Sequence, residues 1–452
     1  MLPPWVAAFS ELPLSLDGTK TATRLIDYHL SRKRLIWTAC WPNVILFAMS
    51  GDVEMLVVGG GLIGLLLGTA CAGAGLEVAV VDPADPTAVL DQGFDGRCSA
   101  IAYGSSRVVE ALGLWPEIGS RAEPIVEIRV ADDESPLFLH YDHRQLGTGA
   151  PLGYVVENLV LRRALVERAQ SLPSLLFLAR HTVRSVETSA FTAVATLADG
   201  RQVRSRLVAA ADGQKSPLRL GAGIGAVESR YHQTGIVTTV KHERPHGGIA
   251  VEHFLPAGPF AILPMSGNRS SIVWTEQNEV AARLVGLPDV AFAAELAARF
   301  GDFLGAVELN GPRWMYPLGV MLAERYVARR LALVGEAAHV IHPIAGQGLN
   351  LGIRDVATLA ELVIDTRRLG LDIGDDALLA RYQRWRHFDT LMLAAVTDGL
   401  NRLFSNSIAL VRFARDLGFA GVHRLPPLKR LLMRDAMGTF GDLPRLVRGE
   451  PL

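Results

Sequence analysis

The sequence predicts an α/β fold with three parts: a domain built on a mostly parallel sheet, an antiparallel β-sheet inserted into it, and a helical C-terminal region. Two short apolar runs, at residues 53–58 and 331–336, each lead through glycines toward a helix, as in parallel α/β units. Between them, residues 234–274 alternate strand-like stretches with Pro and Gly turns. Residues 376–452 carry apolar stretches and an excess of basic side chains, a composition typical of amphipathic helices.

The composition is that of a soluble enzyme. With 452 residues, 49% of them hydrophobic, and a net charge of −1, the chain can bury a large core in two or three domains and shows no bias toward nucleic acid. Cys40, Cys71 and Cys98 lie far apart, so neither a disulfide framework nor a dithiol centre is supported, and a cytoplasmic location is expected. The histidines show no zinc-binding spacing, and His339 and His342 are interpreted as packing or loop residues.

Residues 1–48 are predicted to lie outside the fold. Three basic residues precede the apolar run 35–48, which imitates a signal sequence but has only 14 residues and is broken by Pro42. Met49 leads directly into the first strand, so an over-extended start is the favoured interpretation, with a surface anchor or a targeting segment as alternatives. The extension is therefore expected to be dispensable.

The first element is a Rossmann-like strand–turn–helix. The strand at 53–58 runs into the pattern GxGxxG, in which Gly59 allows the turn, Gly61 admits a pyrophosphate and Gly64 lets the helix pack on the strand. A second strand then ends at Asp82, 23 positions after Gly59, where a ribose-binding acid is expected. A glycine-rich turn or a strand-end carboxylate alone is common, but the whole ordered series predicts a dinucleotide site.

Two further segments follow that first unit. The segment 95–100, with Arg97, precedes an apolar helix, and a second helix is predicted over 159–169. The apolar strand 207–211 ends in Asp212 and Gly213, which by themselves indicate only a turn.

The inserted region is expected to contain four strands, and its position determines the predicted domain boundaries. Strands are expected within 234–240, 248–254, 260–263 and 270–274, and they form the antiparallel sheet. In chain order, the predicted domains are 49–225, the first part of the nucleotide-binding domain; 226–311, the β-rich substrate domain; 312–375, the second part of the nucleotide-binding domain; and 376–452, the helical region.

The run from His342 to Asp355 is predicted to face a ligand. Pro343 stiffens the turn, Gly346 and Gly348 keep Cβ atoms out of the way, and the following helix offers unpaired N–H groups and a positive dipole end. An ordinary strand-to-helix turn would explain the proline and one glycine, but not both glycines around Gln347.

The C-terminal 77 residues have two interpretations. They contain twelve Arg or Lys against seven Asp or Glu, with apolar stretches at 391–396 and 425–433. A packed helical appendage is the simpler interpretation, and a basic apolar face that docks on a membrane or a complex is the other. No transmembrane span is expected.

These separated pieces resemble the aromatic-ring-hydroxylating flavoprotein monooxygenases of the p-hydroxybenzoate hydroxylase type, and within them the ubiquinone-biosynthesis hydroxylases. The resemblance covers residues 49–452. The motifs that carry it are Gly335–His339 with Ile341–Gly352, Glu252–Pro256 with Gly258–Pro264, and Ala436–Gly438 with Asp442–Pro444. It implies an FAD-binding Rossmann-like domain with a β-sheet substrate domain and a C-terminal helical region.

The resemblance also implies roles for the adenosine half of the site. Gly59, Gly61 and Gly64 would hold the FAD pyrophosphate and Asp82 the ribose. Arg97 would lie beside the flavin chain.

Other residues are implied to hold the flavin half. Asp212 and Gly213 would contact FAD and nicotinamide, and Glu336 would bond a ribityl hydroxyl, although aspartate is usual at its position. Leu349, together with Gly346 and Gly348, would present backbone N–H groups to the pyrimidine edge of the flavin, with Pro343 against the ring.

The implied activity is that of an FAD-dependent monooxygenase that hydroxylates a polyprenylated phenol in ubiquinone biosynthesis. NAD(P)H would reduce FAD, and O2 would form a flavin hydroperoxide that passes oxygen to the ring. The segment 221–225 is glycine-rich but lacks a preceding strand, so NAD(P)H would bind transiently, with a separate electron donor as the alternative. The rival interpretations are a hydroxylase of a small soluble aromatic compound and a non-catalytic flavin-binding sensor or partner subunit. The expected location is cytoplasmic or peripheral at the inner membrane, and no catalytic base is identified.

Overall fold

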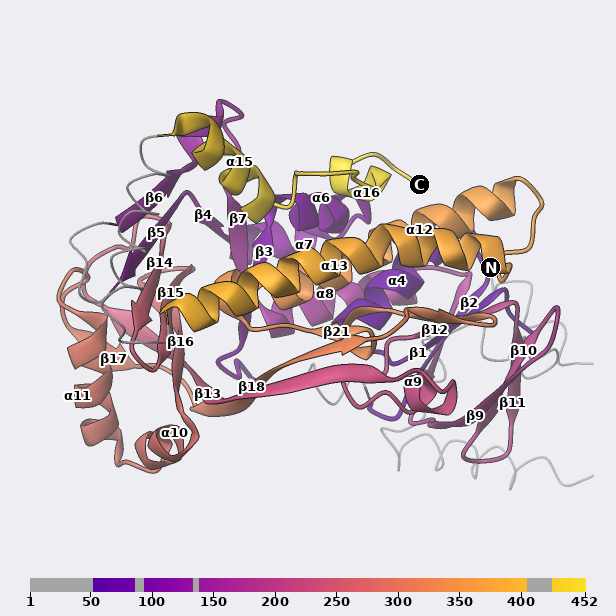
Figure 1. The fold of residues 1–452 in the computed structure, drawn as a ribbon, viewed down its shortest axis with the longest axis horizontal. Coiled ribbons are helices and arrows are strands. Elements are labelled where there is room, and N and C mark those ends of the chain that lie inside the picture. Colours follow the sequence, from indigo (N-terminus) through magenta and orange to yellow (C-terminus); the bar gives the residue numbers. More distant parts are fainter. Residues whose placement is uncertain (1–51, 86–92, 133–137, 405–424) are drawn as a thin grey trace, which may run out of the picture.

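The computed structural model describes residues 52–85, 93–132, 138–404 and 425–452 (Figure 1). The prediction for residues 1–48, and Cys40 with it, lies outside these ranges.

The first domain is built on a parallel sheet, as predicted. Its strand order is β19-β20-β12-β1-β2-β8, and every neighbouring pair is parallel except β19 with β20. The bounds are β1 Met55–Val58, β2 Val78–Asp82, β8 Leu175–Ala179, β12 Leu207–Ala210, β19 Val327–Ala328 and β20 Leu331–Leu333. The residues of β1, β12 and β20 are all buried, which explains their uninterrupted apolar sequences.

Helices cover this sheet. The helix α4 (Leu62–Gly73) follows the glycine motif and packs against both α8 (Asn158–Gln170) and α12 (Gln347–Arg368). Because α4 contacts helices that begin about 100 and 285 residues later, the nucleotide-binding domain is assembled from distant parts of the chain.

The second sheet has nine strands and is mixed. Its order is β21-β18-β13-β16-β15-β14-β5-β6, with β17 paired to β13, and all pairs are antiparallel except β5 with β14. The bounds are β5 Glu127–Asp132, β6 Phe138–Asp142, β13 Ala226–His242, β14 Ile249–Leu255, β15 Gly258–Met265, β16 Arg269–Gln277, β17 Val307–Leu309, β18 Trp314–Ala323 and β21 His339–Val340. The four strands predicted within 234–274 are confirmed as β13 to β16. Five further strands come from outside that stretch.

Two helices cover the outer face of this sheet. They are α10 (Asn278–Val285) and α11 (Asp289–Phe300). A separate apolar core forms there, centred on Phe260, Trp274 and Phe292. The opposite face is left to meet the nucleotide-binding domain.

Two small sheets and several short helices complete the β-rich parts. One sheet joins β3 (Cys98–Ala102), β7 (Gly153–Glu157) and β4 (Glu123–Ile125), and the other joins β9 (Val183–Thr188), β10 (Ala193–Leu197) and β11 (Gln202–Ser205). The short helices are α6 (Tyr103–Ala111), α7 (Trp115–Ile118) and α9 (Pro217–Gly221).

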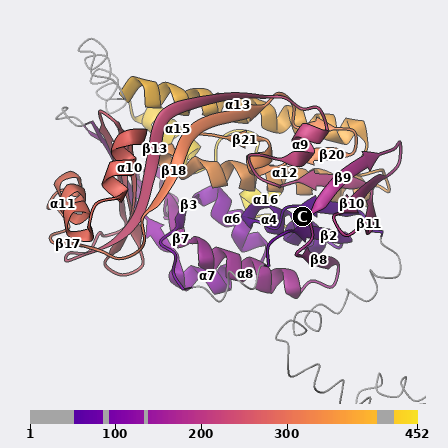
Figure 2. The same cartoon turned by 90° about the horizontal axis from the view of Figure 1, so that it is seen from below.

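The strands β13 and β18 connect the two domains. Their pairing shifts register between Arg230 and Thr234, and Figure 2 shows both running along α13 from the sheet end of the molecule toward α9. The glycine-rich segment 221–225 begins at the last residue of the helix α9 and leads into β13, so it is not a strand–turn–helix nucleotide motif.

The C-terminal region is helical, as predicted. It comprises α13 (Asp376–Phe404), α15 (Pro426–Ala436) and α16 (Arg445–Arg448). The hydroxyl of Tyr382 in α13 donates to the carbonyl of Leu333 at 2.9 Å, so α13 is held against the end of the parallel sheet. None of the described helices is long and apolar enough to cross a bilayer.

Candidate functional site

Two adjoining cavities form the candidate site. The larger, of about 630 Å³, lies where β1, β2, β12 and β20 end, the edge at which open α/β sheets bind ligands. The second, of about 390 Å³, lies between the nine-stranded sheet and the loop before α12. Ser99, Glu336, Gly348 and Leu349 line both, so the two cavities meet at these four residues.

The glycine motif opens onto the larger cavity. Gly59 has φ of +105°, and a Cβ there would collide with the carbonyl of Ala211, while a Cβ on Gly64 would collide with the carbonyl of Gly59. These two glycines are required by the protein's own backbone. A Cβ on Gly61 would meet no protein atom within 4 Å, and Gly61 lines the cavity. The motif therefore leaves at Gly61 the open approach that a pyrophosphate needs.

Asp82 lies at the rim of the same cavity and also orders the motif. Its Oδ2 accepts a hydrogen bond from the N–H of Gly60 at 2.5 Å, and its Oδ1 accepts one from Ala84 at 2.7 Å. Each carboxylate oxygen keeps further acceptor capacity for a ribose hydroxyl.

Asp212 and Gly213 lie on the opposite side of the cavity. Oδ2 of Asp212 accepts from the N–H of Leu218 at 3.2 Å, but its Oδ1 is buried and has no hydrogen-bond partner among the described residues. Burial raises the pKa of this carboxyl above its usual value, although its contacts with Ser216 and Leu218 oppose the shift. Gly213 has φ of +85°, and a Cβ there would meet no protein atom within 4 Å.

The loop before α12 shows which glycine needs its backbone conformation. Gly346 has φ of +62°, and a Cβ on it would lie 3.0 Å from the Cβ of Ala100. Asn350 fixes this turn, since its Nδ2 donates to the carbonyls of Ala100 and Gly346, each at 2.9 Å. Gly348 has no left-handed φ and lies in the first turn of α12, so its backbone conformation does not require glycine. A Cβ on Gly348 would enter open space.

The loop residues divide between the two cavities. Pro343 and Gly346 line only the second cavity, whereas Gly348 and Leu349 line both. Glu336 is exposed and also lines both, so its carboxylate stands at the junction expected for a ribityl chain.

Arg97 stands apart from the other predicted residues. Its guanidinium binds the carboxylate of Asp95, with Nε 2.8 Å from Oδ2, and lies 5.4 Å from the ring centre of Trp314. The side-chain hydrogen bond to Asp95 is the main cause that raises the pKa of Arg97. Arg97 is absent from the described residues that line either cavity, so its contact with the flavin chain stays a prediction.

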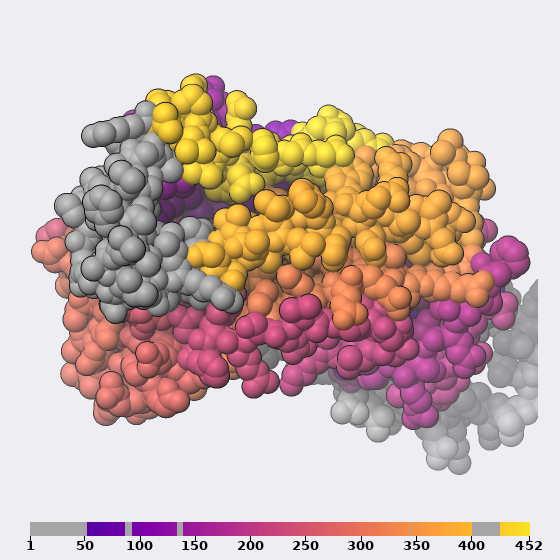
Figure 3. Space-filling view, viewed as in Figure 1, coloured from indigo at the N-terminus to yellow at the C-terminus, as the bar shows by residue number. Residues whose placement is uncertain are grey.

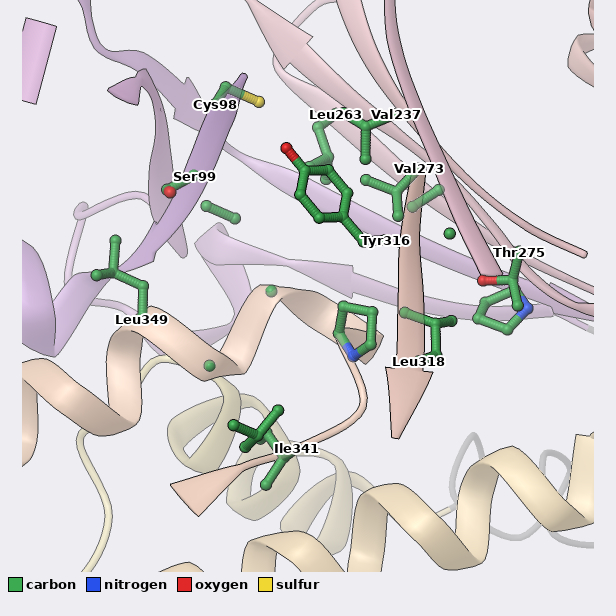
Figure 4. A pocket seen from close by; sticks show the side chains of 18 of the residues that line it. Cys98, Ser99, Val237, Leu263, Val273, Thr275, Tyr316, Leu318, Ile341 and Leu349 are labelled. Carbon is green, nitrogen blue, oxygen red and sulfur yellow. The ribbon is translucent and has the colours of Figure 1, made fainter. Parts of the chain in front are cut away.

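The second cavity has a mostly apolar wall (Figure 4). The nine-stranded sheet contributes Val237, Leu263 and Val273 from one side, and Ile341 lies on the other. The ring of Tyr316 stands between these walls. Such a space suits a flat, weakly polar ring.

A buried charge cluster supports the loop between the cavities. Nε2 of His339 lies 2.6 Å from Oδ2 of Asp355, and Nε of Arg386 lies 2.7 Å from Oδ1. The N–H of Gly335 also donates to Asp355, at 3.0 Å. Burial alone would raise the pKa of Asp355, but His339 and Arg386 hold it below its usual value. His339 lines the second cavity, so the interpretation of this residue as packing alone is incomplete.

Several lining residues were missed from sequence. Asn158 begins α8, and its Oδ1 accepts from the hydroxyl of Ser99 at 2.7 Å, with both residues lining the larger cavity. Its place at a predicted strand-to-helix junction was a usable signal. Thr275 and Tyr316 line the second cavity, and only the pairing of the sheet places them there.

The larger cavity fits FAD on the protein's own geometry. Gly61, Gly213 and Gly348 all face it with open space where a side chain would stand, which the packing of the protein does not explain. Asp212, whose Oδ1 is buried without a hydrogen-bond partner among the described residues, also lines it. Among the described residues there is no cluster of His, Cys, Asp or Glu that could hold a metal ion.

Comparison with known proteins agrees with this geometry. The sequence profile described as FAD binding domain matches residues 52–390. The chain belongs to this FAD-binding family. Ubiquinone hydroxylase UbiL of Rhodospirillum rubrum is 53% identical over 402 residues, which cover 88% of this chain and 93% of the relative. The 3-demethoxyubiquinol 3-hydroxylase of Escherichia coli is 34% identical over 396 residues, covering 85% of this chain and 98% of the relative.

Solved structures share the fold of this chain. The p-nitrophenol 4-monooxygenase PnpA of Pseudomonas putida superposes with a TM-score of 0.71 at 20% identity, covering 85% of this chain and 98% of that protein. The family match shows that FAD is the cofactor of this chain, and Gly61, Asp82, Asp212 and Gly348 line the larger cavity.

Proposed function

We propose that this protein is an FAD-dependent monooxygenase that hydroxylates the aromatic ring of a polyprenylated phenol in ubiquinone biosynthesis. The observation that carries the proposal is that a glycine-lined nucleotide cavity and an apolar, ring-sized cavity meet at Ser99, Glu336, Gly348 and Leu349. A flavin held in the first cavity would present its reactive edge to a ring in the second. The likeness to two ubiquinone-ring hydroxylases supports the same substrate class.

The charge of the second cavity favours a phenol over a small aromatic acid. None of the described residues that line it is Lys or Arg, while Glu252 is a buried carboxylate in its wall. His339 is already paired with Asp355. A substrate carboxylate would lose water without gaining a cationic partner, which costs free energy. A neutral phenol with an apolar tail does not incur this cost.

The protein supplies position and a dry site. Bound FAD would carry electrons from NAD(P)H, or from another donor, to O2 and deliver one oxygen atom to the ring while the other leaves as water. The first turn of α12 places backbone N–H groups at the junction of the cavities, where negative charge develops during turnover. The apolar wall around Val237 and Val273 excludes water from the ring.

The test is an assay of the purified full-length chain. We expect FAD to copurify without a covalent link, and NAD(P)H oxidation to depend on an ortho-prenylated phenol and to yield its hydroxylated product. p-Hydroxybenzoate, a small aromatic acid, is the matched control and should not be hydroxylated. Complementing bacterial strains that each lack one ubiquinone-ring hydroxylase would identify the ring position. Protein that does not bind FAD, or that hydroxylates only the small acid, would contradict the proposal.

We also propose that a C-terminal surface holds the enzyme at a membrane or at other proteins of the pathway. In α13, Phe388, Leu391, Met392 and Val396 are exposed and recur at helical spacing, and Arg384 is exposed one turn before them. In α15, Leu428 and Leu431 are exposed beside Arg430 and Arg434. Both helices lie on the face shown in Figure 3.

Vesicle flotation tests this surface. The protein should float with vesicles that contain anionic phospholipid, and the double variant Leu391→Glu and Met392→Glu should lose flotation while keeping FAD. Wild-type protein that stays with the soluble fraction would exclude a membrane and leave a protein partner as the use of this surface.

A further inference from the structure

The hydroxyl of Thr275 is a buried polar group without a partner. Thr275 lies in β16, its side chain is 1% exposed, and its Oγ1 makes no hydrogen bond to the described residues. Leaving a buried hydroxyl unpaired disfavours the folded state, so an unpaired hydroxyl that lines a cavity is a candidate to bind a ligand there. Thr275 also lines the second cavity. An oxygen or nitrogen atom of a bound molecule would supply the missing partner.

The neighbouring chain holds this hydroxyl in place. A Cβ on Gly258, the first residue of the neighbouring strand β15, would lie 2.5 Å from Cγ2 of Thr275 and 3.0 Å from Nε2 of Gln233. The methyl group of Thr275 thus packs against a position that only glycine can occupy. Because the methyl group of Thr275 points toward Gly258, its hydroxyl points in another direction. Figure 4 shows the hydroxyl turned toward the interior of the cavity.

Thr275 lies at one end of the second cavity. The sheet register aligns Thr275 with Gly235 of β13, which in turn is aligned with Tyr316 of β18, and all three line the cavity. Leu349, where the two cavities meet, is at the opposite side of this view (Figure 4). A ring lying between Thr275 and the flavin-facing loop would therefore have one edge at the hydroxyl and the other toward the cofactor.

We propose that the Thr275 hydroxyl binds an oxygen substituent of the substrate ring and so determines which ring carbon faces the flavin. The inference rests on the proposed function. Apolar walls alone allow a flat ring to rotate in its plane, whereas one hydrogen bond at the rim selects one rotation. Thr275 is thus a specificity-determining residue whose hydroxyl acts on the bound substrate and not on the flavin.

The experiment removes the hydroxyl from the protein and from the ligand in turn. Thr275→Val has nearly the same shape, and its control is Thr238→Val, because Thr238 is also 1% exposed with an unpartnered hydroxyl but does not line either cavity. The ligands are an ortho-prenylated phenol and the matching prenylbenzene without the hydroxyl. Binding is read from the flavin absorbance, and products are separated by chromatography.

We expect wild type and Thr238→Val to bind the phenol more tightly than the prenylbenzene. Thr275→Val should reduce affinity for the phenol by about five- to tenfold, the usual effect of one neutral hydrogen bond, with little change for the prenylbenzene. Its FAD content and rate of flavin reduction should match wild type, while hydroxylation spreads to a second ring carbon and more reducing equivalents are lost as peroxide. Thr275→Ser should restore part of the preference.

Two results would overturn the proposal, and they have different consequences for the proposed function. Equal losses for both ligands, or an unchanged product pattern in Thr275→Val, would show that the hydroxyl is not the anchor while leaving the proposed function standing. Wild-type protein that binds FAD but neither ligand would overturn the substrate class and the anchor together.

Discussion

Asp355 joins His339, in the wall of the second cavity, to Arg386, in the C-terminal helix α13. Its Oδ2 lies 2.6 Å from Nε2 of His339, and its Oδ1 lies 2.7 Å from Nε of Arg386. All three side chains are almost fully buried. Since Asp355 also accepts from the N–H of Gly335, one carboxylate couples the cofactor loop to α13.

Removing this carboxylate should destabilise the whole protein. In Asp355→Ala the guanidinium of Arg386 would stay buried without its main partner, and breaking such a buried pair costs about 3 to 5 kcal/mol. We expect a loss of that size in the free energy of unfolding, measured by urea denaturation with FAD at saturation. The matched control is Asp365→Asn, which breaks the pair of Asp365 with Arg445 at a half-exposed site and should cost about 1 kcal/mol or less. Equal losses of unfolding free energy in both variants would show that the buried cluster stabilises the protein no more than the half-exposed pair does.

The buried side chain of His342 should make the folded protein less stable in mild acid. Its side chain is fully buried, neither ring nitrogen has a partner among the described residues, and burial lowers its pKa to about 4 despite an opposing effect of Asp398. In the unfolded chain a histidine takes up its proton near pH 6.5. Between about pH 6.5 and 4 the unfolded state therefore binds more protons, so stability is full above pH 6.5 and falls as the pH drops toward 4.

The magnitude and its control follow from the same linkage. A shift from 6.5 to about 4 corresponds to about 3 kcal/mol across the window. His342→Leu should lack this contribution, so the difference in unfolding free energy between wild type and variant should change between pH 7.5 and pH 5. A difference that does not vary with pH would show that the pKa of His342 is the same in the folded protein as in the unfolded chain.

The two loop glycines should behave differently. Gly346→Ala places a side chain at a left-handed φ and 3.0 Å from Ala100, so it should lower the thermal stability of the protein. A Cβ on Gly348 meets no protein atom within 4 Å, so in Gly348→Val the fold and the adenosine half of the FAD site should survive. Its side chain would instead enter the junction of the two cavities. At FAD concentrations that keep the flavin bound, hydroxylation should fall at least tenfold. The fall should approach the hundredfold that is typical when a backbone N–H donor to developing negative charge is lost. Normal turnover in Gly348→Val would move the active site elsewhere.

Asp82→Ala should weaken FAD binding. The variant loses a charged acceptor for the ribose and also the hydrogen bond that fixes the N–H of Gly60. A charge-assisted hydrogen bond contributes about 1.5 to 3 kcal/mol, so the dissociation constant for FAD should rise roughly 10- to 150-fold. Fluorescence titration of the apoprotein with FAD measures it, and Asp82→Asn, which keeps one acceptor oxygen, should lose less. An unchanged dissociation constant would remove Asp82 from the ribose site.

Much of the cofactor site was predictable because its signals are local. Gly59, Gly61, Gly64 and Asp82 lie within one strand–turn–helix–strand unit, where adjacent residues set the geometry. The same holds for Pro343, Gly346 and Gly348 before α12, although only the structure separates the strained Gly346 from the unstrained Gly348. Asp212 comes after the buried strand β12. Only the sheet pairing shows that β12 lies next to β1.

The sequence by itself determined the α/β class, the two ligand-facing turns, the run of strands from β13 to β16 and the family resemblance. Only the tertiary structure decided that β5 pairs in parallel with β14, that Asp355 binds both His339 and Arg386, and that Thr275 lines the second cavity. The physical reason is that strand and turn signals depend on neighbouring residues, whereas these contacts join residues separated by up to about 120 positions. Their position depends on the register of sheets and the packing of helices, which no local pattern encodes.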